Sequence, residues 1–182
     1  MTDITPTPRL LRTVRLDASD TLVFDRAAQP GEWAVPGGFA FFDVDPRQLE
    51  GRARVAFRGG FLGVSTLGWS TLVQVVNASE ADCRDAIGQL ACRLQEHFGA
   101  PDAETARQAA AEEFTFAASL AAQPPGTVIA VHRAFEDGAI RETFRTLRPR
   151  DGEAPLRAFS FLEAEDDESE PLDLIGLSGK EP

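Results

Sequence analysis

The alternation of apolar and polar residues is clearest between Thr127 and Leu147, where two period-two runs flank Asp137-Gly138. Such alternation is typical of half-buried β-strands. An Asp-Gly pair between two such runs is a strong hairpin signal, because both central positions of a type I′ turn require a positive φ. The pattern therefore predicts a two-stranded hairpin, residues 127–147, closed by a two-residue loop.

A two-residue loop also fixes which residues face one another and which share a face of the ribbon. The cross-strand pairs expected on the mainly apolar face are Phe135 with Ile140, Arg133 with Glu142, Val131 with Phe144 and Ile129 with Thr146. The opposite face is small and polar at its middle.

Patterning along the rest of the chain predicts further strands and three helices. The strands are expected at residues 9–16, 21–24, 39–44, 62–67 and 70–76, and the helices at residues 46–58, 79–98 and 101–122. Ser79 with Asp82 resembles a capping box at the start of the second helix. The order of elements predicts an α+β fold, mainly an antiparallel sheet built from hairpins with about three helices packed on it.

The length of 182 residues suits one domain with a core. We expect a flexible N-terminal arm at residues 1–8, a single α+β domain at 9–150, and an acidic tail at 151–182. The net charge is −11, and the tail alone contains ten acidic and two basic residues. The body of the protein is therefore close to neutral, and most of the net charge belongs to the tail.

Within the tail, a short apolar segment follows the acidic run Glu163–Glu170. A tail that served only solubility would not need these aliphatic residues, and a short helical turn could present them together. Because such a turn is too short to be stable alone, it would gain order by docking. We expect docking on a protein partner or in a homodimer through Leu172, Leu174, Ile175 and Leu177.

Composition excludes several classes of function. The sequence contains no apolar run long enough to cross a bilayer and no secretory signal, so we expect a cytoplasmic protein without membrane contact. The absence of a basic stripe argues against nucleic acid. Lys180 is the only lysine and there is no tyrosine, so neither type can act catalytically in the core. Cys83 and Cys92 are nine residues apart on one predicted helix and cannot share a metal. We expect no metal and no cofactor.

Three other strings have ordinary structural interpretations. The segment 33–38, WAVPGG, is similar to the opening of a Nudix box, but the acidic residues that would follow it are missing, and Val44 stands where the first is needed. The glycines of residues 59–68 are expected in tight turns between strands. Glu112-Glu113 does not form a catalytic dyad in itself, because adjacent helical residues point about 100° apart. It is expected on a solvated helix face.

The polar face of the hairpin carries the one constellation in which a titratable group meets fixed positive charge. His132 lies opposite Thr143, with Arg141 and Arg145 on the partner strand. Guanidinium groups in such an arrangement suit a carboxylate or a phosphate. This face is therefore a candidate site for a small anionic ligand.

Four strings resemble a family of small uncharacterised bacterial proteins. They are residues 10–17 (LLRTVRLD), 31–35 (GEWAV), 63–73 (GVSTLGWSTLV) and 132–142 (HRAFEDGAIRE), and the resemblance covers roughly residues 9–150. It assigns no catalytic residue. It implies an accessory role, linked to the maturation of a molybdenum-dependent enzyme or of a lipoyl or biotinyl enzyme.

Two hypotheses follow from the sequence. The first is a non-enzymatic accessory or binding protein with a protein partner. The second is a small-molecule anion-binding protein or enzyme that uses the polar face of the 127–147 hairpin. A concave pocket containing His132, Arg141 and Arg145 would favour the second hypothesis.

Overall fold

The computed structural model describes residues 7–149 and 162–164. Its strands are β1 (Arg9–Val14), β2 (Trp33–Val35), β3 (Phe61–Gly63), β4 (Trp69–Ser70), β5 (Leu72–Asn77), β6 (Val128–Glu136), β7 (Ala139–Pro149) and β8 (Leu162–Ala164). Its helices are α1 (Ser19–Val23), α2 (Gly51–Gly59), α3 (Glu80–His97) and α4 (Ala103–Leu120), with 3₁₀ turns η1 (Gly38–Phe41) and η2 (Pro46–Gln48).

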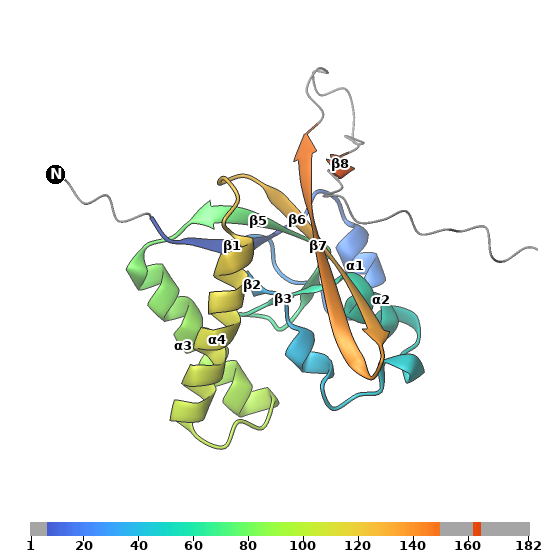
Figure 1. Cartoon of the computed structure of the whole chain (residues 1–182), viewed down its shortest axis with the longest axis horizontal. Coiled ribbons are helices and arrows are strands. Elements are labelled where there is room, and N and C mark those ends of the chain that lie inside the picture. The colour runs from blue at the N-terminus through green and yellow to red at the C-terminus, as the bar shows by residue number, and fades with distance from the viewer. Residues whose placement is uncertain (1–6, 150–161, 165–182) are drawn as a thin grey trace, which may run out of the picture.

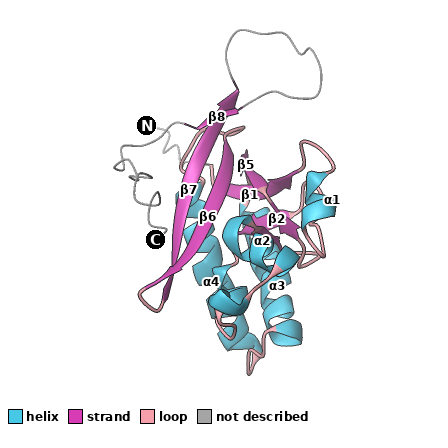
Figure 2. Cartoon of the chain, turned by 90° about the vertical axis from the view of Figure 1, so that its right-hand side faces the viewer, coloured by secondary structure: helices cyan, strands magenta, loops and turns pink. Residues whose placement is uncertain are grey.

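The strands form one curled antiparallel sheet in the order β4-β3-β2-β1-β5-β6-β7-β8 (Figure 1). The predicted α+β class and antiparallel sheet are confirmed. The three predicted helices correspond to α2, α3 and α4, and α1 is a short addition of five residues. Helices α2, α3 and α4 lie on the same side of the β6–β7 ribbon (Figure 2).

The hairpin β6–β7 has the register that its turn predicted, including the pairs Arg133–Glu142 and His132–Thr143. Asp137 and Gly138 have φ values of 51° and 77°. These are the positive values that a type I′ turn requires, and a glycine or an aspartate adopts them at low cost. Local turn chemistry therefore determined the pairing of these strands.

The two long helices also begin where the sequence indicated. Ser79 and Asp82 form a reciprocal capping box at the start of α3, and Asp102 accepts a hydrogen bond from the Thr105 amide at the start of α4. Three alanines of α4, Ala106, Ala110 and Ala117, are fully buried. Their small side chains allow α4 to pack closely against β1 and β2.

The core divides into a large and a small cluster of buried residues. The large one joins the sheet to α3 and α4, and includes Leu11, Leu90 and Ile129. The small one contains Phe24, Phe41, Ala56 and Phe57, and the side chains of Phe135 and Ile140 near the hairpin turn pack against it.

Two expected strands are wrong. Residues 19–23 form helix α1 instead of a strand at 21–24, because the Asp20 carboxylate is buried and accepts hydrogen bonds from Ser70 and Thr71. Residues 38–41 form a 3₁₀ turn instead of a strand at 39–44, because Gly37 adopts a φ of 76° and redirects the chain directly after β2.

The expected helix at 46–58 is divided, since η2 ends at Gln48 and α2 begins at Gly51. Asp45 caps η2 by accepting a hydrogen bond from the Arg47 amide. In α2, Ala56 and Phe57 are buried, whereas Ala53 is exposed. The expected strand at 62–67 ends at Gly63, and residues 64–68 form a tight loop before β4.

Candidate functional site

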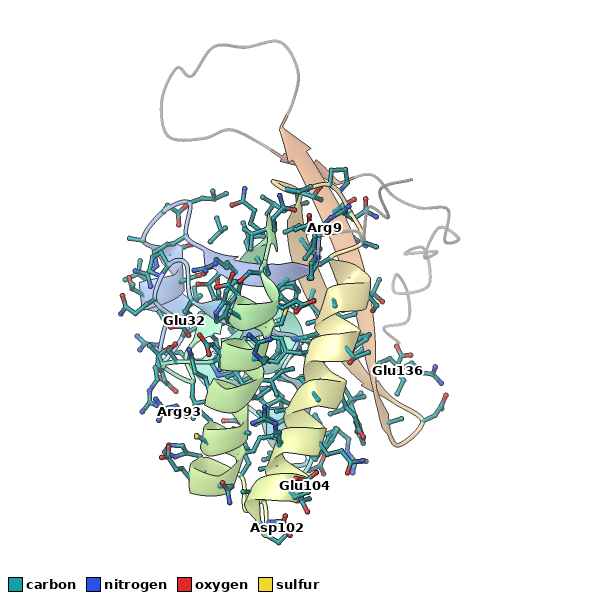
Figure 3. The ribbon with its side chains drawn as sticks, turned by 90° about the vertical axis from the view of Figure 1, so that its left-hand side faces the viewer. Arg9, Glu32, Arg93, Asp102, Glu104 and Glu136 are labelled. Carbon is teal, nitrogen blue, oxygen red and sulfur yellow. The ribbon has the colours of Figure 1, made fainter. Side chains whose placement is uncertain are left out.

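The three residues of the predicted anion site lie on the outer face of the β6–β7 ribbon. His132, Arg141 and Arg145 are all exposed and share that face with Thr143. Arg141 already lies 3.5 Å from Glu136 and 4.0 Å from Asp137, near the hairpin turn where Figure 3 labels Glu136. Neither of the two hollows described below is lined by these side chains, and the anion site stays a prediction.

The docking residues predicted in the tail, Leu172, Leu174, Ile175 and Leu177, lie outside the described residues. The same holds for residues 165–170 of the acidic run and for residues 1–6 of the expected arm, whereas Glu163 and Ala164 belong to β8.

On the inner face of the ribbon, Arg133 is the largest fully buried side chain in the described part of the protein. Its Nε donates to Glu142 Oε1 at 2.7 Å, Nη1 donates to the Phe57 carbonyl, and Nη2 donates to the carbonyls of Pro36 and Gly60. A buried guanidinium is tolerated only when its donors are satisfied and its charge is paired, and both conditions hold here.

Arg133 joins three segments that are distant in the sequence. Phe57 belongs to the last turn of α2, whose carbonyls have no partner within the helix and carry partial negative charge. Pro36 follows β2, and Glu142 lies on β7. The predicted register places Arg133 opposite Glu142 on the apolar face, but it does not show that Arg133 joins α2 and the loop after β2. The sequence does contain an indication that Arg133 is buried. It lies two and four residues after the buried Val131 and Ile129, and so on the same face of the strand.

The Pro36-Gly37-Gly38 loop closes over this ion pair. At Gly37 a Cβ would lie 2.5 Å from the Leu62 Cβ, and at Gly38 a Cβ would lie 2.9 Å from Glu142 Oε1. Gly37 is therefore required both for this close approach and for its positive φ, whereas a side chain at Gly38 would displace the carboxylate of Glu142. The string that resembles a Nudix opening has a packing role at this position.

Glu113, on α4, meets the same loop from the other side. Its Oε1 accepts a hydrogen bond from the Gly37 amide at 3.1 Å, while the neighbouring Glu112 is exposed. Burial raises the pKa of Glu113, and the Glu142 charge raises it further, against the lowering effects of the Gly37 bond and of Arg133. The expectation of a solvated face is correct for Glu112 and wrong for Glu113.

The side chain of Glu113 lines a cleft of about 530 Å³. The cleft lies between the segment after Gly38 and the end of the helix pair α3–α4. We call it the α3–α4 cleft. It lies toward the start of α4, where Figure 3 labels Asp102 and Glu104. Its lining residues are Phe39, Phe42, Asp43, Leu94, Phe98, Gly99, Ala100, Thr105, Ala109, Glu112 and Glu113.

The walls of the cleft are aromatic and aliphatic. Phe39 and Phe98 pack edge to face with their ring centroids 5.2 Å apart, and buried Leu94 lies between the helices. Phe42, at the rim, is 74% exposed. An aromatic ring this exposed beside an apolar hollow is typical of a binding surface, because monomeric proteins seldom expose contiguous apolar area.

A second hollow, of about 350 Å³, is polar and is lined by Ser65, Gln89, Cys92, Arg93 and Glu96. Its charged groups are already engaged, because Arg93 donates to the Ser65 carbonyl and to Glu96. Cys83 and Cys92 are both free thiols on α3, and burial raises the pKa of Cys83.

The described residues provide neither a cluster of metal ligands nor a helix that could span a membrane. Among residues 7–149 and 162–164, no group of three or more His, Cys, Asp or Glu side chains is placed to hold a metal ion. Over the same residues, no helix is both long enough and apolar enough to span a bilayer.

Comparison with known proteins gives a family and nothing more specific. No curated protein and no solved structure matches the chain. Residues 8–166 match the family described as "Family of unknown function (DUF6505)". This match covers most of the sequence and includes both the Arg133 ion pair and the α3–α4 cleft. The chain therefore belongs to that family of unknown function.

Proposed function

We propose that this chain is a non-enzymatic binding protein whose α3–α4 cleft receives a segment of a partner protein. The observation that carries the proposal is Phe42, an aromatic side chain 74% exposed at the rim of an apolar hollow. Exposed aromatic residues beside a pocket are frequent anchors of protein interfaces, where a few side chains supply most of the binding energy.

The charge of the cleft indicates which kind of segment fits. Of the side chains that the structure describes, three carboxylates, Asp43, Glu112 and Glu113, line it, and no Lys, Arg or His does. An acidic segment would be repelled, and a segment with apolar residues and positive charge is complementary. The acidic tail of the chain itself is disfavoured as an occupant for the same reason.

The geometry favours binding over catalysis. Nucleophilic catalysis is not supported, because the described cleft lining places no Ser, Cys or His side chain beside Glu113. An accessory role in maturing a molybdenum, lipoyl or biotinyl enzyme is compatible with this proposal and would make such an enzyme the source of the segment.

The test uses the full chain as bait for a phage-displayed library of random peptides, with affinities then measured by fluorescence anisotropy. We expect selected peptides to combine apolar and basic residues. Phe42→Ser should weaken their binding by about tenfold or more, the loss of one central anchor. Leu22→Ser is the matched control, because Leu22 is also an exposed apolar residue, at 69%, but lies on α1.

Both substitutions are at exposed positions, so both variants should keep the thermal midpoint of the parent. Selected peptides that bind equally well to the parent and to the Phe42→Ser variant would place the interface elsewhere and refute the proposal.

A further inference from the structure

Glu113 is a half-buried carboxylate without a cation. Its only hydrogen bond in the described structure comes from the Gly37 amide to Oε1, at 3.1 Å, and no ion pair involves it there. The nearby guanidinium of Arg133 favours the charge of Glu113 only through space. It makes no hydrogen bond to Glu113 in the described structure, because it donates to Glu142 and to three carbonyl oxygens.

This situation costs free energy as long as Glu113 is ionised. Burial removes water from the carboxylate, and the charge of Glu142 repels it. The other two carboxylates of the cleft, Asp43 and Glu112, are exposed and keep their hydration. A positive group entering the cleft therefore gains most from Glu113, whose Oε2 makes no hydrogen bond in the described structure.

The surroundings of Glu113 restrict the kind of cation. A divalent metal would need several oxygen or nitrogen ligands converging on one point, and the described residues contain no such group. The neighbours in the cleft are instead apolar, with Phe39, Leu94, Phe98 and Ala109 among them. A cation suited to this site is organic and is attached to an apolar group that fills the cleft.

We propose that Glu113 is the counter-ion for a primary ammonium or guanidinium group that the ligand of the α3–α4 cleft carries beside an apolar group. Recognition then has two points, the apolar group among the phenylalanines and the cation at Glu113. For a protein partner, this means a Lys or Arg side chain next to the apolar anchor. To that extent the inference rests on the proposed function.

The test uses small probes, so that it does not depend on a protein partner. 4-Phenylbutylamine and the neutral 4-phenylbutanol are titrated into the full chain at pH 7 and followed by amide NMR shifts. We expect the amine to bind the parent about tenfold tighter than the alcohol, as for a charge-assisted hydrogen bond in a partly dry site. Resonances of residues lining the cleft should shift.

Glu113→Gln should reduce the preference for the amine to less than about threefold, because the amide can still accept the Gly37 hydrogen bond but has no charge. Glu112→Gln is the control on the same helix and should keep the preference, since Glu112 is exposed. A thermal midpoint no lower than that of the parent in both variants would establish that the fold is intact. If Glu113→Gln unfolds, Glu113→Met replaces it, because methionine also removes the charge, with the same expected loss of preference.

Equal binding of amine and alcohol by the parent would overturn the inference, as would failure of both to bind, or an equal loss of preference in Glu112→Gln. The two proposals fail separately. Peptides whose binding depends on Phe42 but shows no preference for a basic residue would leave the proposed function and refute the role of Glu113. Amine binding that depends on Glu113, without any peptide binding, would support the role of Glu113 and refute the proposed function.

Discussion

Replacing Arg133 with methionine tests whether its buried ion pair holds the small cluster of buried residues, which includes Phe41 and Phe57, against the sheet. The variant keeps a long apolar side chain and loses every donor. Three carbonyl oxygens and the Glu142 carboxylate are then left without their hydrogen bonds. These acceptors belong to α2, to the loop after β2 and to β7, so the loss affects three segments at once.

The magnitude follows from the burial of the acceptors. A buried acceptor left without a donor costs about 1–3 kcal/mol. The Glu142 side chain is 17% exposed and can recover some hydration, whereas the side chain of Arg133 is completely buried. We expect a loss of about 4 kcal/mol in the free energy of unfolding, within the about 3–5 kcal/mol typical of breaking a buried pair. For a protein of this size, the thermal midpoint would fall by about 8–16 °C.

Urea unfolding followed by circular dichroism measures the loss, and hydrogen exchange locates it. The amides of α2 should lose protection before those of β1 and β5. Arg141→Met is the matched control, because Arg141 lies on the same hairpin but is 61% exposed, and it should change stability by less than about 0.5 kcal/mol. A loss in Arg133→Met no larger than in this control would refute the reasoning.

Four further predictions concern the turn, the cleft, the outer face and the tail. Gly138→Val should lower the free energy of unfolding in urea by more than about 1 kcal/mol, because a β-branched residue resists a φ of 77°. Gly88→Ala should raise it by up to about 1 kcal/mol, because Gly88 lies within helix α3 and an added Cβ would meet no atom within 4 Å. The pKa of Glu113 is raised above its ordinary 4.5, so its protonation stabilises the fold fully below that pH and this contribution disappears as the pH rises through the raised pKa. Glu113→Gln should therefore gain stability relative to the parent over that rise in pH, while Glu112→Gln should show no such trend in parallel urea titrations. If the outer face binds anions, the Arg141→Ala, Arg145→Ala double variant should lose phosphate-induced thermal stabilisation, and equal stabilisation of variant and parent would exclude the site. Removal of residues 163–182 should leave cooperative unfolding intact and lose a partner or dimer contact by light scattering, and loss of cooperativity would instead place the tail in the core.

The sequence alone determined the elements whose signals are local. Asp137-Gly138 set the register of β6–β7, since a two-residue turn leaves one pairing that keeps the apolar residues on one face. Ser79 with Asp82 and Asp102 with Thr105 set the starts of α3 and α4 through hydrogen bonds within one turn. In each case the interacting groups are within a few residues of one another, so a pattern can reveal them.

Tertiary structure decided what depends on groups far apart in the chain. Residues 19–23 form helix α1 because the Asp20 carboxylate accepts hydrogen bonds from Ser70 and Thr71, about fifty residues away. Arg133 is fully buried because acceptors in α2 and in the loop after β2, more than seventy residues away in the chain, bind its Nη1 and Nη2 groups. The α3–α4 cleft exists because the turn at Gly37 brings Phe39 and Phe42 against the helix pair, and Glu113 is half-buried for the same reason. Helical spacing puts Glu113, and not Glu112, on the same face as the buried Ala106, Ala110 and Ala117. The packed loop at Gly37 then determines how far this carboxylate loses its water.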